Sequence, residues 1–344
     1  MKRAPNISDV AARAGISRST AARAMSGNGY VDSETKKIVE QAARELGYRR
    51  SAIARTLRTN RSDTVGILIA DISNPIFPRI VKGADEVLAP EGMTLLLCNT
   101  EGDSVKQMAF VQKMLERQAD GLILVSQSLP EAVTALLAGG PPSVFVNRRP
   151  DPDAFDYVGP DNVAGIEALL AHLSVAGHRH VGYIGGPENS STARERLGAF
   201  QEAAPRFGIV SDPDLQLLRE YDYGAEREGA AELLTRSGRI TAIVASNDMA
   251  AMGVIAEARS RGLRVPEDLS VTGYDGAFRE PMWESLYPDR PQLTTIGLPR
   301  RQIGVEAARL LLRRIKAPEA AVAKMILPIE MIAGNTTGPA RPRS

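Results

Sequence analysis

From residue 64 onward, short apolar runs alternate with amphipathic stretches of helical period, and this alternation is the strongest constraint on the fold. It is typical of parallel sheets, because each parallel strand needs a long crossover, usually a helix, to reach the next. The predicted strands are residues 65–70, 94–99, 121–126, 143–147, 180–185, 242–246, 270–274, 293–296 and 326–332. The predicted helices are residues 78–89, 105–118, 163–176, 194–207, 225–236, 249–261 and 301–315. These strands are too many for one small sheet, so we expect an α/β unit of two doubly wound parallel sheets with a cleft between two lobes.

Polar residues follow several of the predicted strands. Asp71 follows the first, Asp161 and Arg196 lie after later ones, and Asn247 and Asp275 come after two more. Ligands of open α/β sheets bind beyond the C-terminal ends of the strands. Carboxylates, amides and an arginine that converge there suit a small polar ligand such as a sugar, with a nucleobase or a sugar acid as alternatives.

The N-terminal stretch ISDVAARAGISRSTAARAMSGNGY, residues 7–30, has a different pattern. It predicts a first helix capped by Ser8 and ended by Gly15, then a second helix capped by Ser17. Two short helices around a glycine turn form the helix-turn-helix pattern, which makes this domain all-α. Arg18, Ser19 and Arg23 could read base edges, while Ser17 and Thr20 could bond phosphate. The alternative is an alanine-rich helical hairpin with a solvated arginine face.

A third helix is expected at residues 31–46, with Ile38, Ala42 and Leu46 facing inward. Residues 49–63 follow and contain five arginines. This segment is either a charged linker or a short helix that orders on DNA, with apolar side chains in the minor groove and arginines on phosphate.

Charge separates the same two regions. Residues 1–61 hold 13 Lys+Arg and 5 Asp+Glu, a balance of +8, and the remaining 29 basic and 36 acidic residues give −7. A basic head on an acidic body predicts that the head meets phosphate.

Other classes of protein have less support. The single cysteine, Cys98, lies in an apolar run and is expected to be a buried thiol. The sequence shows no signal-peptide or transmembrane run, so we expect a cytoplasmic protein, and a secreted sugar carrier is disfavoured. His178 and His180 lack metal-ligand spacing, so no metal or cofactor is expected. Paired cleft carboxylates leave a glycosidase as the alternative from another class, but nothing else in the sequence supports an enzyme.

Together these residues resemble the LacI/GalR family of bacterial transcription regulators over residues 6–335. The resemblance is carried by the motifs ISDVAARAGISRST, AIARTLRTNRSDTVGILIADISNPIF, GHRHVGYIGG, SNDMAAMG and GLRVPEDLSVTGYD. It implies a repressor that binds a palindromic operator as a homodimer under the control of a small effector in a cleft like that of periplasmic sugar-binding proteins. It also implies residues 1–48 as headpiece, 49–63 as hinge and 64–337 as effector and dimerisation domain. The first lobe would be residues 64–160 and 292–321, the second 161–291 and 322–337, and residues 338–344 are expected to be a disordered tail.

The resemblance further assigns roles to single residues. Base reading falls to Arg18, Ser19 and Arg23. Backbone contacts fall to Ser17, Thr20, Tyr48 and Arg55, and minor-groove contacts to Ala54 and Leu57. The implied effector ligands are Phe77, Asp161, Arg196, Tyr223, Asn247 and Asp275.

Three departures from the family pattern stand out. Thr20-Ala21-Ala22-Arg23 lacks a serine of the recognition helix, and Tyr48-Arg49-Arg50-Ser51 lacks the proline that opens the hinge. The segment FREPMWESLYPDR, residues 278–290, is longer than usual, and Trp283 could touch the ligand or pack on the surface. The effector's identity, its role as inducer or corepressor, and the operator sequence stay open.

Overall fold

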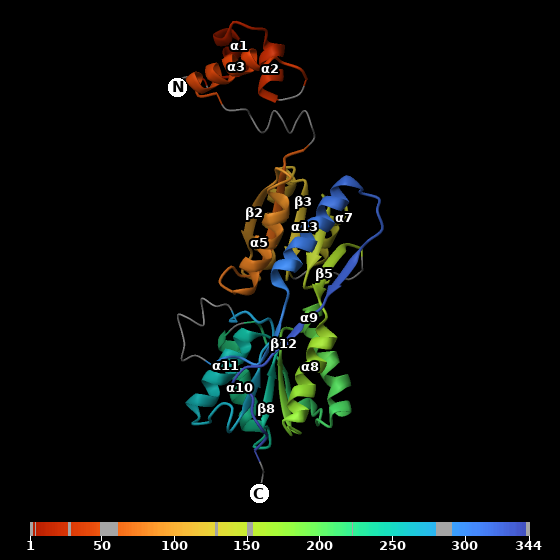
Figure 1. The fold of residues 1–344 in the computed structure, drawn as a ribbon. Coiled ribbons are helices and arrows are strands. Elements are labelled where there is room, and N and C mark those ends of the chain that lie inside the picture. Colours follow the sequence, from red (N-terminus) through yellow and green to blue (C-terminus); the bar gives the residue numbers. More distant parts are fainter. Residues whose placement is uncertain are drawn as a thin grey trace. The chain divides into compact units, whose positions relative to one another are not determined.

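The computed structural model describes residues 3, 5–26, 29–48, 61–127, 130–149, 154–221, 223–279 and 291–341 (Figure 1). The chain divides into two compact units, Met1–Ser62 and Asp63–Ser344. The predicted hinge contacts of Ala54, Arg55 and Leu57 lie outside the described residues, as does most of the segment 278–290 with Trp283.

The first unit contains α1 (Ile7–Ala14), α2 (Arg18–Ser26) and α3 (Ser33–Leu46). The predicted cap of α1 was wrong by two residues. The Asn6 side chain, not that of Ser8, accepts hydrogen bonds from the backbone at the start of α1, and the Asp9 carboxylate accepts from the Asn6 N–H at 2.7 Å. Asn6 is the N-cap in place of Ser8 because its reciprocal capping box with Asp9 satisfies more unpaired N–H groups than a lone serine would.

Both predicted helix ends are confirmed by backbone angles. Gly15 and Gly47 follow α1 and α3 with φ of 66° and 65°, in the left-handed region that glycine adopts without a steric penalty. The small core includes Val10 and Val39. Ile38, predicted to face inward, is 48% exposed, because the helical turn places Val39 against α1 and α2 instead.

In the second unit, a first lobe is built on a six-stranded parallel sheet of order β11-β5-β4-β3-β1-β2. Its strands are β1 (Thr64–Ile69), β2 (Thr94–Asn99), β3 (Gly121–Val125), β4 (Ser143–Val146), β5 (Asp156–Pro160) and β11 (Lys324–Leu327). Strand β5 was not predicted, because its short sequence DYVGP holds few apolar residues.

Alternate residues of these strands face two layers of helices. Ile67 and Ile69 pack toward α5 (Ile76–Leu88) and α13 (Arg300–Lys316), whereas Leu68 packs toward α6 (Ser104–Glu116) and α7 (Glu131–Ala138). Side chains of a strand point alternately to its two faces, so strands buried on both faces read as continuous apolar runs. This continuity is what the sequence pattern detected.

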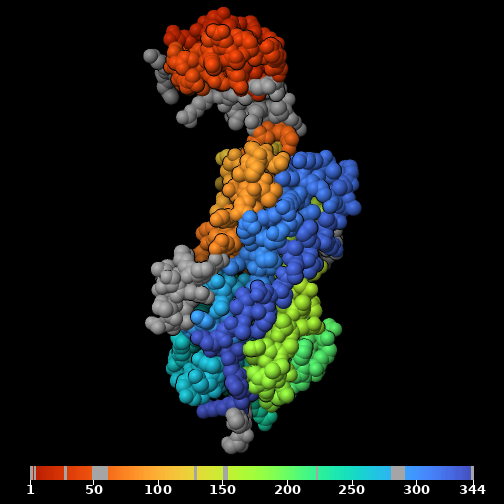
Figure 2. Space-filling model, viewed as in Figure 1, coloured from red at the N-terminus to blue at the C-terminus, as the bar shows by residue number. Residues whose placement is uncertain are grey.

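Helices α5 and α13 lie side by side on the first lobe (Figure 2). A Cβ atom added to Gly83 would come 2.1 Å from the Arg301 carbonyl oxygen, and one added to Gly304 would come 2.0 Å from that of Ile80. Glycine is therefore required at both positions for the backbones to approach so closely.

The second lobe has a four-stranded parallel sheet of order β7-β6-β8-β9. The strands are β6 (Val181–Gly185), β7 (Gln216–Leu218), β8 (Ala242–Ala245) and β9 (Ser270–Thr272). Tyr183 packs toward α8 (Asn162–Val175) and α9 (Ser191–Ala203), and its neighbour Ile184 toward α10 (Tyr223–Arg236) and α11 (Asp248–Ser260). The two parallel doubly wound sheets confirm the predicted fold class.

The chain passes between the lobes at two more places, near β10 (Thr295–Gly297) and β12 (Glu330–Ile332), which pair antiparallel. The predicted lobe boundaries were wrong here. Lys324–Leu327 pairs with β5 in the first lobe, and residues 294 and 297 bridge to Thr272 and Asp275 of the second. The predicted strand 326–332 is two strands separated by Pro328, which has no N–H for a ladder.

The start of the predicted tail is ordered. The Gly338 carbonyl oxygen lies 3.0 Å from His178 Nε2, the Ala340 N–H donates to the Ala176 carbonyl, and Arg341 pairs with Asp268 at 3.0 Å. The sequence pattern missed this because hydrogen bonds to the second lobe, not an apolar stripe, hold the segment.

Candidate functional site

Helix α2 presents an exposed polar face. Arg18, Ser19 and Arg23 are exposed, while Ala21 and Ala24 are buried against the rest of the unit. Small buried residues on one side and long cationic ones on the other are what a helix needs to enter a groove lined by phosphate.

Hydroxyl groups surround the start of this helix. The Ser17 hydroxyl accepts from the Thr20 N–H at 3.1 Å, as a cap does, and lies 2.9 Å from the Ser19 hydroxyl and 2.8 Å from that of Thr20. The cluster places three hydroxyls beside the first N–H groups of α2, a favourable position for an anion. Tyr48 is half-buried and packs on the core of this unit.

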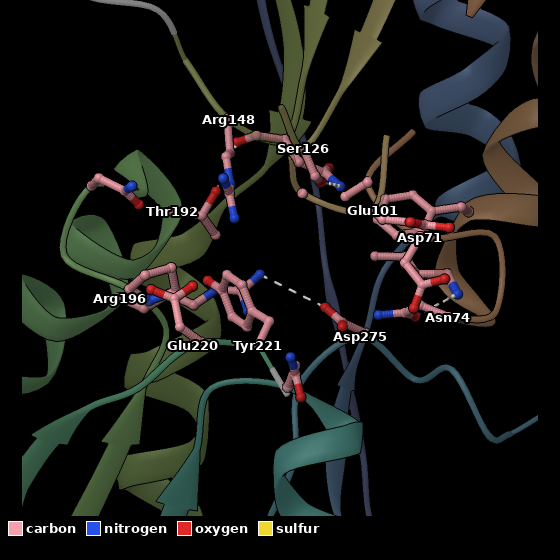
Figure 3. A pocket seen from close by; sticks show the side chains of 18 residues that line it. Asp71, Asn74, Glu101, Ser126, Arg148, Thr192, Arg196, Glu220, Tyr221 and Asp275 are labelled. Carbon is pink, nitrogen blue, oxygen red and sulfur yellow. Dashed lines mark hydrogen bonds and ion pairs between the residues drawn. The ribbon is translucent and has the colours of Figure 1, made fainter. Parts of the chain in front are cut away.

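The second unit contains a cavity of about 670 Å³ where the two lobes meet (Figure 3). Its lining comes from segments that follow strands of both sheets. The lining residues are Ala70, Asp71, Asn74, Ile76, Phe77, Glu101, Gly102, Ser126, Asn147, Arg148, Pro187, Asn189, Thr192, Arg196, Glu220, Tyr221, Asn247 and Asp275. Mixed carboxylate, amide, guanidinium and aromatic groups suit a hydroxylated ligand with one flat face.

Arg196 is the best-supported group of this cavity. Its Nε donates to Asn162 Oδ1 at 2.9 Å and its Nη1 donates to the Ser246 carbonyl. Its guanidinium lies 3.5 Å from the centroid of the Tyr274 ring and 3.8 Å from an Asp275 carboxylate oxygen. A buried guanidinium held on several sides presents its remaining N–H groups in a fixed direction.

Asp275 is strained and electrostatically perturbed. Its φ of 112° lies in the left-handed region, and its backbone is held there by bonds to the Ile296 carbonyl and the Leu298 N–H. Such strain concentrates at functional sites. Burial raises the pKa of Asp275 to about 7, against the lowering effect of Arg196, and burial raises the pKa of neighbouring Asp248 to about 6.

The structure brings together four of the predicted effector residues: Phe77, Arg196, Asn247 and Asp275 all line the cavity. Asp161 does not. Its carboxylate accepts from the Ala164 N–H at 2.9 Å and caps α8, which is why an aspartate stands there. The Tyr223 side chain lies outside the described residues, and Tyr221 lines the cavity.

Several lining residues were missed by sequence reasoning, among them Asn147, Arg148 and Thr192. Asn147 and Arg148 directly follow β4, so the rule that ligands bind beyond strand ends would have found them. Thr192, on the first turn of α9, lies between β6 and Arg196, so the same rule would have found it as well. Among the described residues, no group of three or more His, Cys, Asp or Glu could hold a metal ion, and no helix is long and apolar enough to cross a membrane.

A small helical unit with a cationic helix face, joined to a two-lobed unit with a polar cavity, defines a ligand-controlled DNA-binding transcription regulator. Comparisons with known proteins agree. Residues 6–51 match the model of bacterial regulatory proteins of the lacI family, and residues 62–335 match that of periplasmic binding proteins and the sugar binding domain of the LacI family. The chain belongs to the LacI family.

Individual relatives cover nearly the whole chain. It is 33% identical over 312 residues to the HTH-type transcriptional repressor PurR of Photobacterium profundum, a match covering 90% of this chain and 92% of PurR. The lac repressor dimer bound to operator and the anti-inducer ONPF is 25% identical with a TM-score of 0.82, covering 98% of this chain and all of that one. The complex of the transcriptional regulator CelR with cellobiose is 26% identical with a TM-score of 0.72, covering 96% and 99%.

Proposed function

We propose that this protein is a repressor that binds a palindromic operator as a homodimer and responds to a small polar effector, a sugar or sugar derivative, in the interlobe cavity. The observation that carries the proposal is the presence, in one chain, of the exposed Arg18 and Arg23 on α2 and of a cavity lined by the buried Arg196. Neither feature alone would indicate that a ligand controls DNA binding.

In the proposed complex, Arg18 and Arg23 each donate two hydrogen bonds to a guanine edge. Ser17 and Thr20 contact phosphate, and Ser19 reads a base. Each good bidentate pair contributes about 1–3 kcal/mol of discrimination between bases. One helix-turn-helix covers too few base pairs for specificity, so two-fold pairing of the chain on a palindrome is expected.

The dimer has a candidate surface at the edge of the first sheet. Strand β2 is an edge strand, and three apolar side chains on it or on the segments after β1 and β2 are exposed: Leu97 on β2 at 45%, Ile72 after β1 at 43% and Val105 at the start of α6 at 75%. An edge strand and exposed apolar side chains both favour pairing with another chain.

For the effector, support comes from the cavity itself. Hydroxyl groups of a sugar would match the carboxylate of Asp275, the amide of Asn247 and the guanidinium of Arg196, and its apolar face would lie on Phe77 or Tyr221. One structural relative is described as a cellobiose complex, which favours the same class. An effector that binds one lobe arrangement better than another can change operator affinity only by that difference in affinity.

The test is selection of binding sites by the purified full-length protein from a random duplex pool at near-physiological salt. We expect an enriched palindrome with guanines in both arms, and release or tightening of that duplex on addition of one member of a panel of sugars and nucleosides. Enrichment of no sequence, with and without the panel, would contradict the proposal.

A further inference from the structure

Three consecutive residues after β4, in the first lobe, each contact the second lobe. The Asn147 carbonyl oxygen accepts from the Thr192 hydroxyl at 3.0 Å, and the Arg149 N–H donates to the Ser191 hydroxyl at 2.8 Å. The Arg148 guanidinium lies 5.5 Å from the centroid of the Tyr221 ring and points toward it (Figure 3). This short segment therefore carries a concentration of interlobe contacts.

The segment is anchored firmly to its own lobe. The Tyr157 hydroxyl on β5 donates to the Asn147 carbonyl at 2.9 Å, and the Arg149 guanidinium lies 5.2 Å from the centroid of the same ring. Tyr157 is fully buried, and Asn147 has a φ of 65° that the surrounding bonds maintain. These contacts fix the segment to the core of the first lobe, so a movement of the second lobe relative to it must change the contacts between the lobes.

An ion pair also joins this segment to the second lobe. Arg149 pairs with Glu195 on α9 at 2.6 Å, with the two side chains only 35% and 25% exposed. Glu195 also accepts from Asn162 Nδ2 at 2.7 Å, and Asn162 in turn accepts from Arg196. The ion pair is thereby connected, through two hydrogen bonds, to the Arg196 guanidinium that lines the cavity.

We propose that residues 147–149 form an interlobe latch. Arg149 binds Glu195 beside the cavity, and Arg148 binds the ring of Tyr221 in the cavity wall. Together the two contacts set the distance between the lobes. Both arginines are positioning residues, and the latch is a property of the effector unit that goes beyond the proposed repressor function. Arg148 and Tyr221 both line the cavity, so a molecule bound between them would directly change their contact, which is one of the two contacts of the latch.

The test measures the distance between the lobes by pulsed electron resonance on the full-length chain. Spin labels are attached at Ala135→Cys on α7 of the first lobe and Val175→Cys on α8 of the second, which are both exposed, while native Cys98 is buried. We expect Arg149→Ala and Glu195→Gln each to lower the ratio of close to distant lobe arrangements by about three- to tenfold, a range that fits a partly exposed ion pair. The double variant should change the ratio no further than either single one.

The contact between Arg148 and Tyr221 is tested with a matched pair of variants at Tyr221. Tyr221→Leu and Arg148→Ala should shift the same ratio by about twofold or more, whereas Tyr221→Phe, which keeps the ring face, should not. Arg206→Ala is the control, because it breaks an ion pair with Glu167 that lies wholly within the second lobe.

Distance distributions of the latch variants that match Arg206→Ala would overturn the proposal. Operator selection on the same samples tests the repressor function separately from the latch. Variants that show the expected distances while neither they nor the parent select a DNA sequence would refute the repressor function and leave the latch standing.

Discussion

The exposed face of α2 and the interlobe cavity are built in opposite ways for binding their partners. The groups on α2 are neighbours in sequence, exposed, and held by one short helix whose cap is local. The cavity groups come from residues about 200 positions apart, such as Phe77 and Asp275, and the Arg196 guanidinium that lines the cavity is buried and bonded on several sides. Substitutions on α2 should therefore change recognition with little cost in stability, whereas substitutions in the cavity should change both.

The largest effect is expected for Arg196→Ala. Loss of the guanidinium leaves Asn162, Asp275 and the Tyr274 ring without their partner, and breaking a buried charged network of this kind costs about 3–5 kcal/mol. Urea unfolding should show that loss, and the effector response should disappear while operator selectivity persists. The matched control is Arg194→Ala, an exposed arginine two residues earlier on α9. Equal stability of the two variants would break the contrast drawn above.

For α2, Arg18→Ala should weaken discrimination at one operator position by about 1–3 kcal/mol and leave unfolding unchanged. The readout is competition binding with operators altered one base pair at a time. Arg44→Ala, an exposed arginine on α3, removes the same charge from the same unit. A uniform loss of affinity for all duplexes would mean that Arg18 contacts phosphate and reads no base.

Asp275 predicts a pH dependence of stability. Its pKa of about 7 in the folded chain exceeds the ordinary value of 3.8, so between those limits the folded state keeps a proton that the unfolded state has lost. Stability therefore falls as pH rises toward 7 and is greatest, as far as this group is concerned, on the acid side. Between pH 5.5 and 7.5 the loss should be about 1–2 kcal/mol. Urea midpoints of the parent and of Asp275→Asn should show a flatter dependence in the variant, and parallel curves would contradict the assignment.

The smallest effect tests the cap of α1. Asn6→Ala removes the side chain that accepts from the Ser8 and Asp9 N–H groups and should destabilise this unit by about 1 kcal/mol. Ser8→Ala, at the residue that the sequence first suggested, should have almost no effect. Amide hydrogen exchange in α1 distinguishes them, and faster exchange in the serine variant alone would reverse the assignment.

Sequence patterns predicted the two regions to different depths. The α2 face was readable because helical period, a glycine turn and clustered arginines are local properties. Four cavity residues were readable because strand ends are local too. Asp161 was misassigned because a helix cap and a ligand contact use the same residue types at the same place after a strand. Asn247 caps α11 and also lines the cavity, whereas Asp161 caps α8 and does not. Arg148 and Thr192 also follow strand ends, but many polar residues do, and only the structure shows which of them line the cavity.

The close approach of Gly83 and Gly304 has a mechanical consequence. At these two glycines the backbones of α5 and α13 meet without intervening side chains, so the helices cannot slide past each other there without a steric clash. Phe77 lies on the first turn of α5 and faces the cavity, and the 13-residue helix extends about 20 Å from there. A displacement of the Phe77 ring that moves α5 should therefore move α13 with it.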